Sequence, residues 1–365
     1  MSVYVTRSGH HLPGPAVDNE RIEEVLGRVN GKPSRLKARI LKANGIRRRH
    51  YAIDAEHRTT IGNAEMAARA GEQCLAAAGL GRRDLGLLSV ATSQGDLVLP
   101  GFGSQVQAAL GLGDVELHTS HGICSSSMMA LKTAFLSLAA GEHRRALVVA
   151  SELASRLFKA SRFEAAGAEP DFDAEFLRWM LSDGAGALLL EAAPRGHCLR
   201  IDWIRGYSHA DAYPLCMSVG QAPDGRTWQD FATYAEAEAA GALLLRQDVR
   251  LLDNIVKLGV DGLLRLIDEG RVAVDEVDHL LCHYSSHHFR GRIAEMLTQA
   301  GAMIPEEKWY TNLYERGNTG CASLFIMLDE FLRTREPRPG ERILCMVPES
   351  GRFNTAYMQL TVVDA

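Results

Sequence analysis

The stretch AEMAARAGEQCLAAAGLGRRDLGLLSVATS (residues 64–93) decides the fold, because a diverged copy of it recurs later in the chain. It begins with apolar residues at helical spacing, continues through a polar turn, and ends in an apolar run typical of a buried strand. Residues 253–286, DNIVKLGVDGLLRLIDEGRVAVDEVDHLLCHYSS, follow the same order. The two stretches predict the same helix–turn–strand unit twice.

The likeness continues beyond these units. In each half a Gly-containing turn opens a second apolar helix, first GICSSSMMALKTAFLSLAAG and later GNTGCASLFIMLDEFLRT. A matched strand follows each helix, RALVVASE (145–152) and RILCMVPE (342–349). Matched elements in one order predict two homologous α/β halves, 1–195 and 196–365, that share a core. The alternative is that any α/β protein shows such alternation.

The composition excludes several classes of protein. The chain has 365 residues, of which 46% are hydrophobic and 23% charged, so a disordered or collagen-like chain is excluded. The net charge of −5 provides no basic field for a nucleic acid. No apolar run reaches the roughly 20 residues of a membrane span. The seven cysteines form no CxxC pair, so we expect reduced thiols, a cytoplasmic location, no metal and no cofactor.

Two stretches lie outside the repeat. Residues 153–180 and 205–247 mix aromatic, methionine and charged residues without a clean period. Long insertions in a compact domain are usually functional. We therefore expect them to cover a site or to form a subunit contact.

Cys124 follows a glycine turn and precedes a long apolar helix. A thiol at a helix N-terminus lies near the positive end of the helix dipole and near free backbone amides, both of which favour the thiolate. Its own N–H can also stabilise an oxyanion. The residue is a candidate nucleophile, and the alternative is a buried, inert cysteine.

His283 ends a predicted strand, and Asn318 opens the helix of the second half. If the halves superpose, the two helix starts meet and bring Cys124 to face Asn318, with His283 at the neighbouring strand end. A thiol, an imidazole and a carboxamide at one point suit a thioester site, where the last two stabilise an enolate. This geometry selects His283 over His287 and His288. Glu152 and Glu349 end the matched strands, and we expect structural hydrogen bonds from them; the alternative is a catalytic role.

Six segments carry a family resemblance: NGIRRRHYA (44–52), ATSQGDLVLPGFGSQVQAALGL (91–112), LSDGAGALLLE (181–191), DHLLCHYSS (278–286), GNTGCAS (317–323) and SGRFNTAYMQL (350–360). In this order they resemble β-ketoacyl-acyl-carrier-protein synthase III and its relatives in the thiolase superfamily, over most of the chain. The resemblance implies an α/β, thiolase-like fold in which two pseudo-symmetric halves form a layered αβαβα core.

The resemblance also implies roles for individual residues. Cys124 matches the acylated nucleophile, and His283 and Asn318 match the pair that stabilises the enolate. Gly351 matches the glycine whose amide joins that of Cys124 in the oxyanion hole.

The chain departs from the family after the histidine, where Tyr-Ser-Ser stands in place of Gln-Ala-Asn. Ser286 thus replaces the asparagine that supports the histidine, and His288 falls where an arginine often meets the carrier phosphate. The weaker candidates for contact with the substrate or its carrier are Arg47, Arg48, Ser286, His288 and Arg290.

As to function, the resemblance implies a ketosynthase that joins an enzyme-bound acyl thioester to a malonyl or β-ketoacyl thioester in specialised fatty-acid or polyketide biosynthesis. The chain looks most like the branch that makes dialkylresorcinol or cyclohexanedione precursors. We expect acyl-carrier-protein or coenzyme A thioesters as partners, and a homodimer whose strand RALVVASE extends a sheet across the twofold axis. Two alternatives are an acyltransferase acting on a hydroxyl and a non-catalytic partner subunit; retained Asn318 favours condensation.

Overall fold

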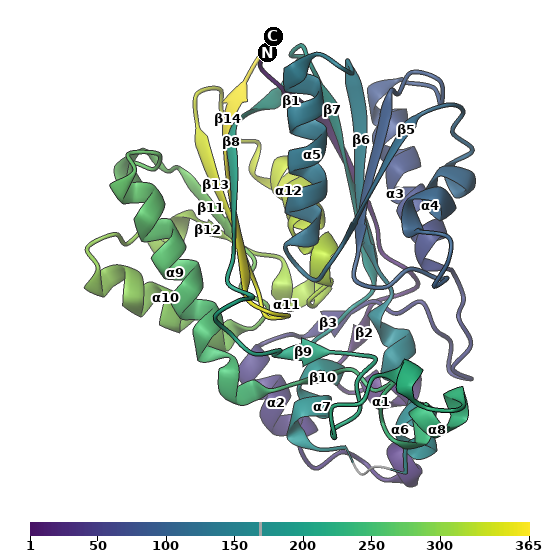
Figure 1. Cartoon of the computed structure of the whole chain (residues 1–365). Helices are drawn as coiled ribbons and strands as arrows, with labels where there is room; N and C mark the ends of the chain where they lie inside the picture. Colours follow the sequence, from purple (N-terminus) through teal and green to yellow (C-terminus); the bar gives the residue numbers. More distant parts are fainter. Residues whose placement is uncertain (168–169) are drawn as a thin grey trace.

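A computed structural model describes residues 1–167 and 170–365 (Figure 1). The strands of its large sheet are β1 (Tyr4–His11), β4 (Leu87–Thr92), β5 (Glu116–His121), β6 (Arg145–Glu152), β7 (Gly184–Glu191), β8 (Cys198–Ser208), β11 (His279–Cys282), β12 (Trp309–Tyr310), β13 (Arg342–Glu349) and β14 (Asn354–Val363). Their order across the sheet is β12-β11-β13-β14-β8-β1-β7-β6-β4-β5. The two halves of the chain therefore occupy the two halves of the sheet, which join where β1 pairs with β8.

The two halves have the same strand order and the same strand directions. In the first half β4 is parallel to β5 and β6, and β7 is antiparallel to β6 and β1. In the second half β11 is parallel to β12 and β13, and β14 is antiparallel to β13 and β8. The predicted α/β fold of two pseudo-symmetric halves is confirmed. The boundary between residues 195 and 196 stays a prediction.

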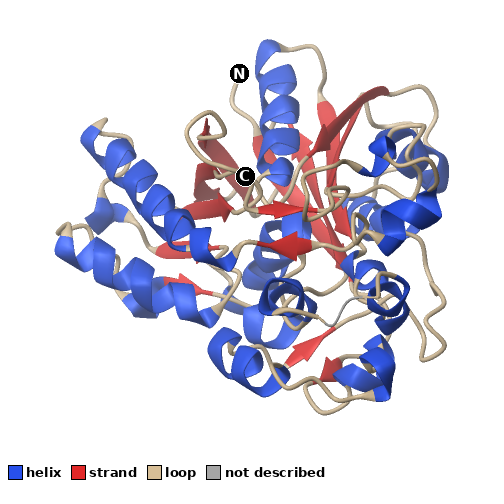
Figure 2. Ribbon diagram, turned by 60° about the horizontal axis from the view of Figure 1, so that its bottom comes forward, coloured by secondary structure: helices blue, strands red, loops and turns tan. Residues whose placement is uncertain are grey.

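Helices and sheet form five layers (Figures 1 and 2). Helices α5 and α12 lie between the two halves of the sheet, because α5 contacts β6 and β8 while α12 contacts β7 and β11. Helices α3 and α4 cover the outer face of the first half, and α9 with α10 covers that of the second. The layered αβαβα core is as expected. These helices are α3 (Asn63–Ala78), α4 (Phe102–Leu110), α5 (Ser126–Ala140), α9 (Asp253–Asp268), α10 (His287–Gln299) and α12 (Ser323–Arg335).

The burial of the elements explains their sequences. One apolar cluster fills the space between the sheet halves, and two others lie under the outer helices. Strands β6 and β13 are buried along almost their whole length, so they are nearly continuous apolar runs. Helix α9 covers only one face of the sheet and keeps a polar side toward solvent.

One expectation about the sheet is wrong. Strand β6 pairs with β7 on one side and β4 on the other, so it lies inside the sheet and cannot extend it across a subunit axis. The free edge of the first half is β5, whose side chains are exposed or half-buried along both faces.

The remaining segments gather at one end of the layers, at the bottom of Figure 1. They come from residues 17–49 and from the stretches 153–180 and 205–247 that interrupt the repeat. No helix within the described residues is long and apolar enough to cross a bilayer. The elements of this end are β2 (Val17–Asp18), α1 (Ile22–Leu26), α2 (Lys37–Asn44), β3 (Arg48–Arg49), α6 (Ala160–Ala165), α7 (Phe172–Arg178), β9 (Met217–Ser218), α8 (Tyr234–Ala239) and β10 (Arg246–Gln247), with α11 (Leu313–Arg316) beside them.

Candidate active site

Cys124 lies in the turn between β5 and α5, immediately before Ser125, which caps the helix. The turn packs along the end of β13 through two contacts. The carboxylate of Glu349 accepts hydrogen bonds from the backbone N–H of Ser125 at 2.9 Å and from its hydroxyl at 2.6 Å. On the other side of Cys124, a Cβ built on Gly351 would lie only 2.5 Å from Cδ1 of Ile123. Residues 123–125 and 349–351 therefore lie side by side, and a side chain at position 351 would have to displace that of Ile123.

The backbone around Gly351 leaves donors free. Its carbonyl accepts from the N–H groups of Cys216 at 3.0 Å and Met217 at 3.2 Å, which fixes the peptide. Neither the N–H of Gly351 nor that of Cys124 has an acceptor among the described residues. Two unpaired amides beside a thiol are the donors that an oxyanion hole requires.

The surroundings of the Cys124 thiol oppose its ionisation. Burial, and then the negative charges of Glu349 and Glu152, raise the pKa of Cys124 well above its usual range. The expectation that the thiolate is favoured is therefore wrong for the free protein. Ionisation needs a base or a bound substrate.

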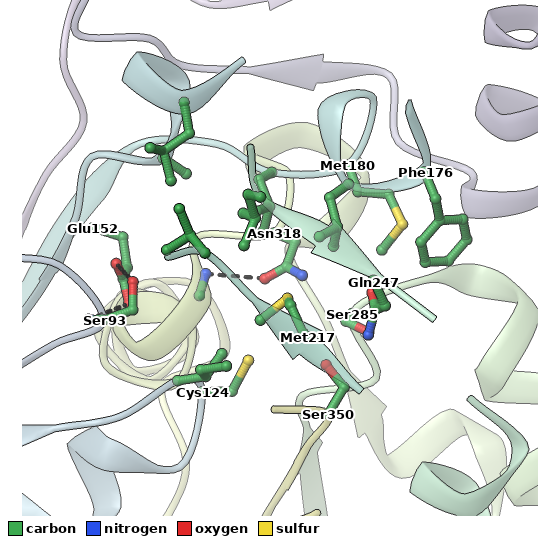
Figure 3. A pocket seen from close by; sticks show the side chains of 18 of the residues that line it. Ser93, Cys124, Glu152, Phe176, Met180, Met217, Gln247, Ser285, Asn318 and Ser350 are labelled. Atoms are coloured by element: carbon green, nitrogen blue, oxygen red, sulfur yellow. Dashed lines mark hydrogen bonds between the residues drawn. The ribbon is translucent and has the colours of Figure 1, made fainter. Parts of the chain in front are cut away.

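Asn318 lies between α11 and the short 3-10 turn η7 (Gly320–Ala322) that leads into α12. Its main chain donates to the carbonyl of Met180 at 3.1 Å and accepts from the N–H of Ser182 at 2.8 Å. Its side-chain Oδ1 accepts from the N–H of Gly320 at 2.9 Å. With Oδ1 occupied, the Nδ2 hydrogens are the groups free to donate (Figure 3).

Cys124 and Asn318 line one cavity of about 290 Å³ (Figure 3). Glu152 lines it too, and its carboxylate accepts from the hydroxyl of Ser93 at 2.5 Å and the N–H of Cys321 at 3.3 Å. Much of the remaining wall is apolar and comes from the two stretches outside the repeat. Representative residues of these stretches in the wall are Leu157, Phe176, Met180, Met217 and Leu245.

His283 follows the end of β11, where its N–H donates to the carbonyl of Met346 at 2.8 Å. The residue is buried, its Nε2 has no hydrogen-bond partner among the described residues, and burial lowers its pKa to about 4. The imidazole is therefore neutral near pH 7. It lines a smaller cavity rather than the pocket of Cys124, and Ser285 lines both cavities. The structure thus brings Cys124 and Asn318 to one cavity and places His283 in a second cavity, with Ser285 lining both.

The basic pair Arg47 and Arg48 lies on the surface. Arg47 forms an ion pair with Glu315 at 2.5 Å, and Arg48 lies 3.5 Å from the same carboxylate. Neither arginine lines the pocket. Their contact with a carrier stays a prediction.

The other weak candidates also lie outside the pocket. Arg290 pairs with Glu306 at 2.8 Å, Ser286 is buried at the start of α10, and His288 is exposed. The sequence did not point to Ser285, Ser350 or Gln247 as pocket residues. Their position in the sequence could have indicated two of them, because Ser285 precedes the candidate Ser286 and Ser350 precedes the candidate Gly351.

Two family models match parts of the chain. Residues 120–205 match the family described as 3-oxoacyl-[acyl-carrier-protein (ACP)] synthase III, and residues 267–352 match its C-terminal family. The two matches contain Cys124, His283, Asn318 and Gly351. The chain is therefore similar to synthase III over both of these regions. It is accordingly a member of the acyltransferase-class condensing enzymes, which form carbon–carbon bonds.

Relatives match the chain along nearly its whole length. β-Ketoacyl-[acyl-carrier-protein] synthase III of Streptococcus equi subsp. equi is 23% identical over 326 residues, 89% of this chain and 88% of that protein. The tetronic acid condensing enzyme AbyA1 is 22% identical with a TM-score of 0.78, covering 98% of this chain and 99% of the other. OleA of Xanthomonas campestris, solved with lauric acid and lauroyl-CoA, is 20% identical with a TM-score of 0.77 and 99% coverage of both chains. The structural matches establish the thiolase-like fold.

Proposed function

We propose that the protein is a ketosynthase that acylates Cys124 and then joins this acyl group to a second thioester by Claisen-type condensation. The observation that carries the proposal is that Cys124 and Asn318 line one pocket, with the Asn318 amide nitrogen free to donate. The similarity to synthase III supports the same reaction.

In the first half-reaction the Cys124 sulfur attacks the carbonyl carbon of an acyl thioester. The N–H groups of Cys124 and Gly351 stabilise the oxyanion, the carrier thiol leaves with a proton, and the acyl group stays on sulfur. Because burial and nearby negative charge hold the thiol in its protonated form, its proton must pass to a base, and neutral His283 is the predicted catalytic residue that can accept it.

In the second half-reaction an enolate forms on the entering thioester, either by loss of CO₂ from a malonyl group or by loss of an α-proton. Asn318 and His283 donate hydrogen bonds to the enolate oxygen. The enolate carbon attacks the acyl carbonyl, the C–S bond breaks, and a β-keto thioester and free Cys124 result.

The apolar wall of the pocket supports an acyl chain as the group held on Cys124, since burial of CH₂ groups is favourable there. Delivery by coenzyme A or an acyl-carrier protein, a cytoplasmic location, and membership of the dialkylresorcinol or cyclohexanedione branch belong to the proposal. So does a homodimer, which the unpaired edge of β5 supports.

Intact-protein mass spectrometry tests the proposal. The full chain and its Cys124→Ala variant are incubated with acyl thioesters of graded length and then with malonyl thioester. We expect an acyl adduct on the parent only, and its disappearance with formation of a β-keto product. A hydroxylamine-labile adduct on the alanine variant would contradict the assignment of Cys124.

A further inference from the structure

Gln247 is a polar residue in an apolar part of the pocket. It lies on β10, pairs with Met217 of β9, and belongs to the stretch 205–247 that covers the site. The residue is 3% exposed and lines the same cavity as Cys124. Its side-chain amide is therefore shielded from bulk solvent but reaches the pocket.

The amide has little to bind within the protein. Its nitrogen lies 3.9 Å from the sulfur of Cys216, a weak acceptor. Its oxygen accepts no hydrogen bond from the described residues. A primary amide offers two donors and two acceptor lone pairs, and buried polar groups are rarely left unpaired because desolvation is costly. The occupant of the pocket is the remaining source of a partner.

The position of the amide indicates which part of the occupant it meets. Figure 3 shows Gln247 on the side of the pocket that carries Phe176 and Met180, whereas Cys124 lies beyond Met217 on the other side. The group of the occupant that binds the Gln247 amide is thus separated from the thioester carbon held on Cys124. No Lys or Arg is among the described residues that line the cavity, so an anionic group there would lack a counter-charge.

We propose that Gln247 is a specificity-determining residue that binds a hydroxyl or keto oxygen carried by the acyl chain on Cys124. This rests on the proposed function, because it requires an acyl chain in the pocket. An amide suits either group, since it donates to a keto oxygen and both donates to and accepts from a hydroxyl. The substrate class is a neutral, oxygenated acyl thioester.

Competition between matched acyl chains tests this proposal. The full chain is offered an equimolar mixture of a saturated acyl-coenzyme A and chains of the same length bearing one hydroxyl or keto group at successive positions. Mass spectrometry reads which acyl group is held on Cys124. We expect one oxygenated chain to load about tenfold or more faster than the saturated chain, because a site built for a hydrogen bond discriminates against its absence.

Apolar variants of similar size test whether the preference depends on the Gln247 amide. Gln247→Leu should abolish the preference and load the saturated chain at least as fast as the parent does. Gln247→Met, which is unbranched like glutamine, should do the same and serves if the leucine variant is unstable. Gln221→Leu makes the same change in the same stretch but outside the pocket, where the side chain donates to the Gly225 carbonyl. It should keep the parent preference.

Other outcomes overturn the proposal. A parent enzyme that loads all chains equally would refute it while leaving the proposed function intact, because Cys124 still acylates. Retention of the preference by both Gln247 variants would also refute it. The same acyl groups are also offered on N-acetylcysteamine in place of coenzyme A. If the preference for the oxygenated chain disappears on this shorter carrier, Gln247 contacts pantetheine and the proposal is refuted. Failure of every thioester to acylate the parent would overturn both proposals.

Discussion

The carboxylate of Glu349 accepts the backbone N–H of Ser125 at 2.9 Å and so ties the end of β13 to the start of α5. The other half contains the equivalent contact, in which Glu152 at the end of β6 accepts the N–H of Cys321 at 3.3 Å, at the start of η7. Each glutamate therefore caps the central helical segment of the opposite half. The structural hydrogen bonds expected of both glutamates are confirmed, and the pair holds the segments that carry Cys124 and Asn318.

Glu349→Gln should lower the pKa of Cys124. The amide oxygen can still accept from Ser125, but the negative charge that raises the thiol pKa is lost. The rate of alkylation of Cys124 by iodoacetamide, measured against pH, should shift to lower pH. The exposed Glu295→Gln on α10 should leave the profile unchanged. An unshifted profile for Glu349→Gln would show that its charge does not reach the thiol.

Gly351→Ala should slow acylation of Cys124. The added Cβ would lie 2.5 Å from Cδ1 of Ile123, so either that side chain or the backbone of the oxyanion hole must move. Loss of one oxyanion donor typically costs about 10²–10³ in rate. Adding Ile123→Ala removes the clash and should restore part of the rate, measured as single-turnover acylation. Equal rates for the single and double variants would exclude the clash as the cause.

Local patterns predicted most of the fold. The helix–turn–strand units follow from the change of apolar period and from glycine turns, and the pseudo-symmetry placed Cys124 and Asn318 together because both precede the central helices. The edge of the sheet was mispredicted, because the apolar content of β6 reflects burial on both faces and strand order depends on distant pairing.

The pocket wall and the state of the thiol could not be predicted. Phe176 and Met217 come from stretches without a period, and only tertiary packing brings them to one cavity. The raised pKa of Cys124 depends on Glu349, which lies in the other half of the chain. Helix-dipole reasoning from the neighbouring sequence could not include that charge.

His283 should make the stability of the fold depend on pH. Burial lowers its pKa from 6.5 to about 4, so between these values the unfolded chain binds the proton and the folded chain does not. The free energy of unfolding therefore does not depend on His283 titration above pH 6.5, and it decreases as the pH drops from 6.5 toward 4. At about 1.4 kcal/mol per pKa unit, this dependence is on the order of 3 kcal/mol.

His283→Asn should flatten this part of the curve, measured by urea denaturation at several pH values. The exposed His288→Asn is the matched control and should keep the parent slope. The same slope in His283→Asn as in the parent would assign the dependence to other histidines, such as buried His50 and half-buried His118, whose pKa values desolvation also lowers.

The edge strand β5 should form the subunit contact. Its outer side has no partner strand among the residues that the structure describes, and Leu117 on it is 37% exposed. Sedimentation should show a dimer of the parent at micromolar concentration, and Leu117→Glu should shift it toward monomer, because charge on an edge opposes pairing. Tyr234→Glu alters an exposed residue on α8 and should leave the dimer intact. A monomeric parent would reject the contact.

Asn318 should separate the two half-reactions. Acylation needs the thiol and the amides of Cys124 and Gly351, whereas condensation also needs a donor to the enolate oxygen. Asn318→Asp keeps an oxygen that can accept the Gly320 N–H but removes the Nδ2 hydrogens, and Asn318→Ala removes both. Both variants should therefore still acquire the acyl adduct, and both should condense about 10²–10³ more slowly, since that is the typical loss for one transition-state donor. Single-turnover assays on pre-acylated protein measure the second step alone. If Asn318→Ala releases product as fast as the parent, enolate stabilisation by this residue fails, and transfer of the acyl group to a hydroxyl, in which Asn318 matters little, becomes the better description of the reaction.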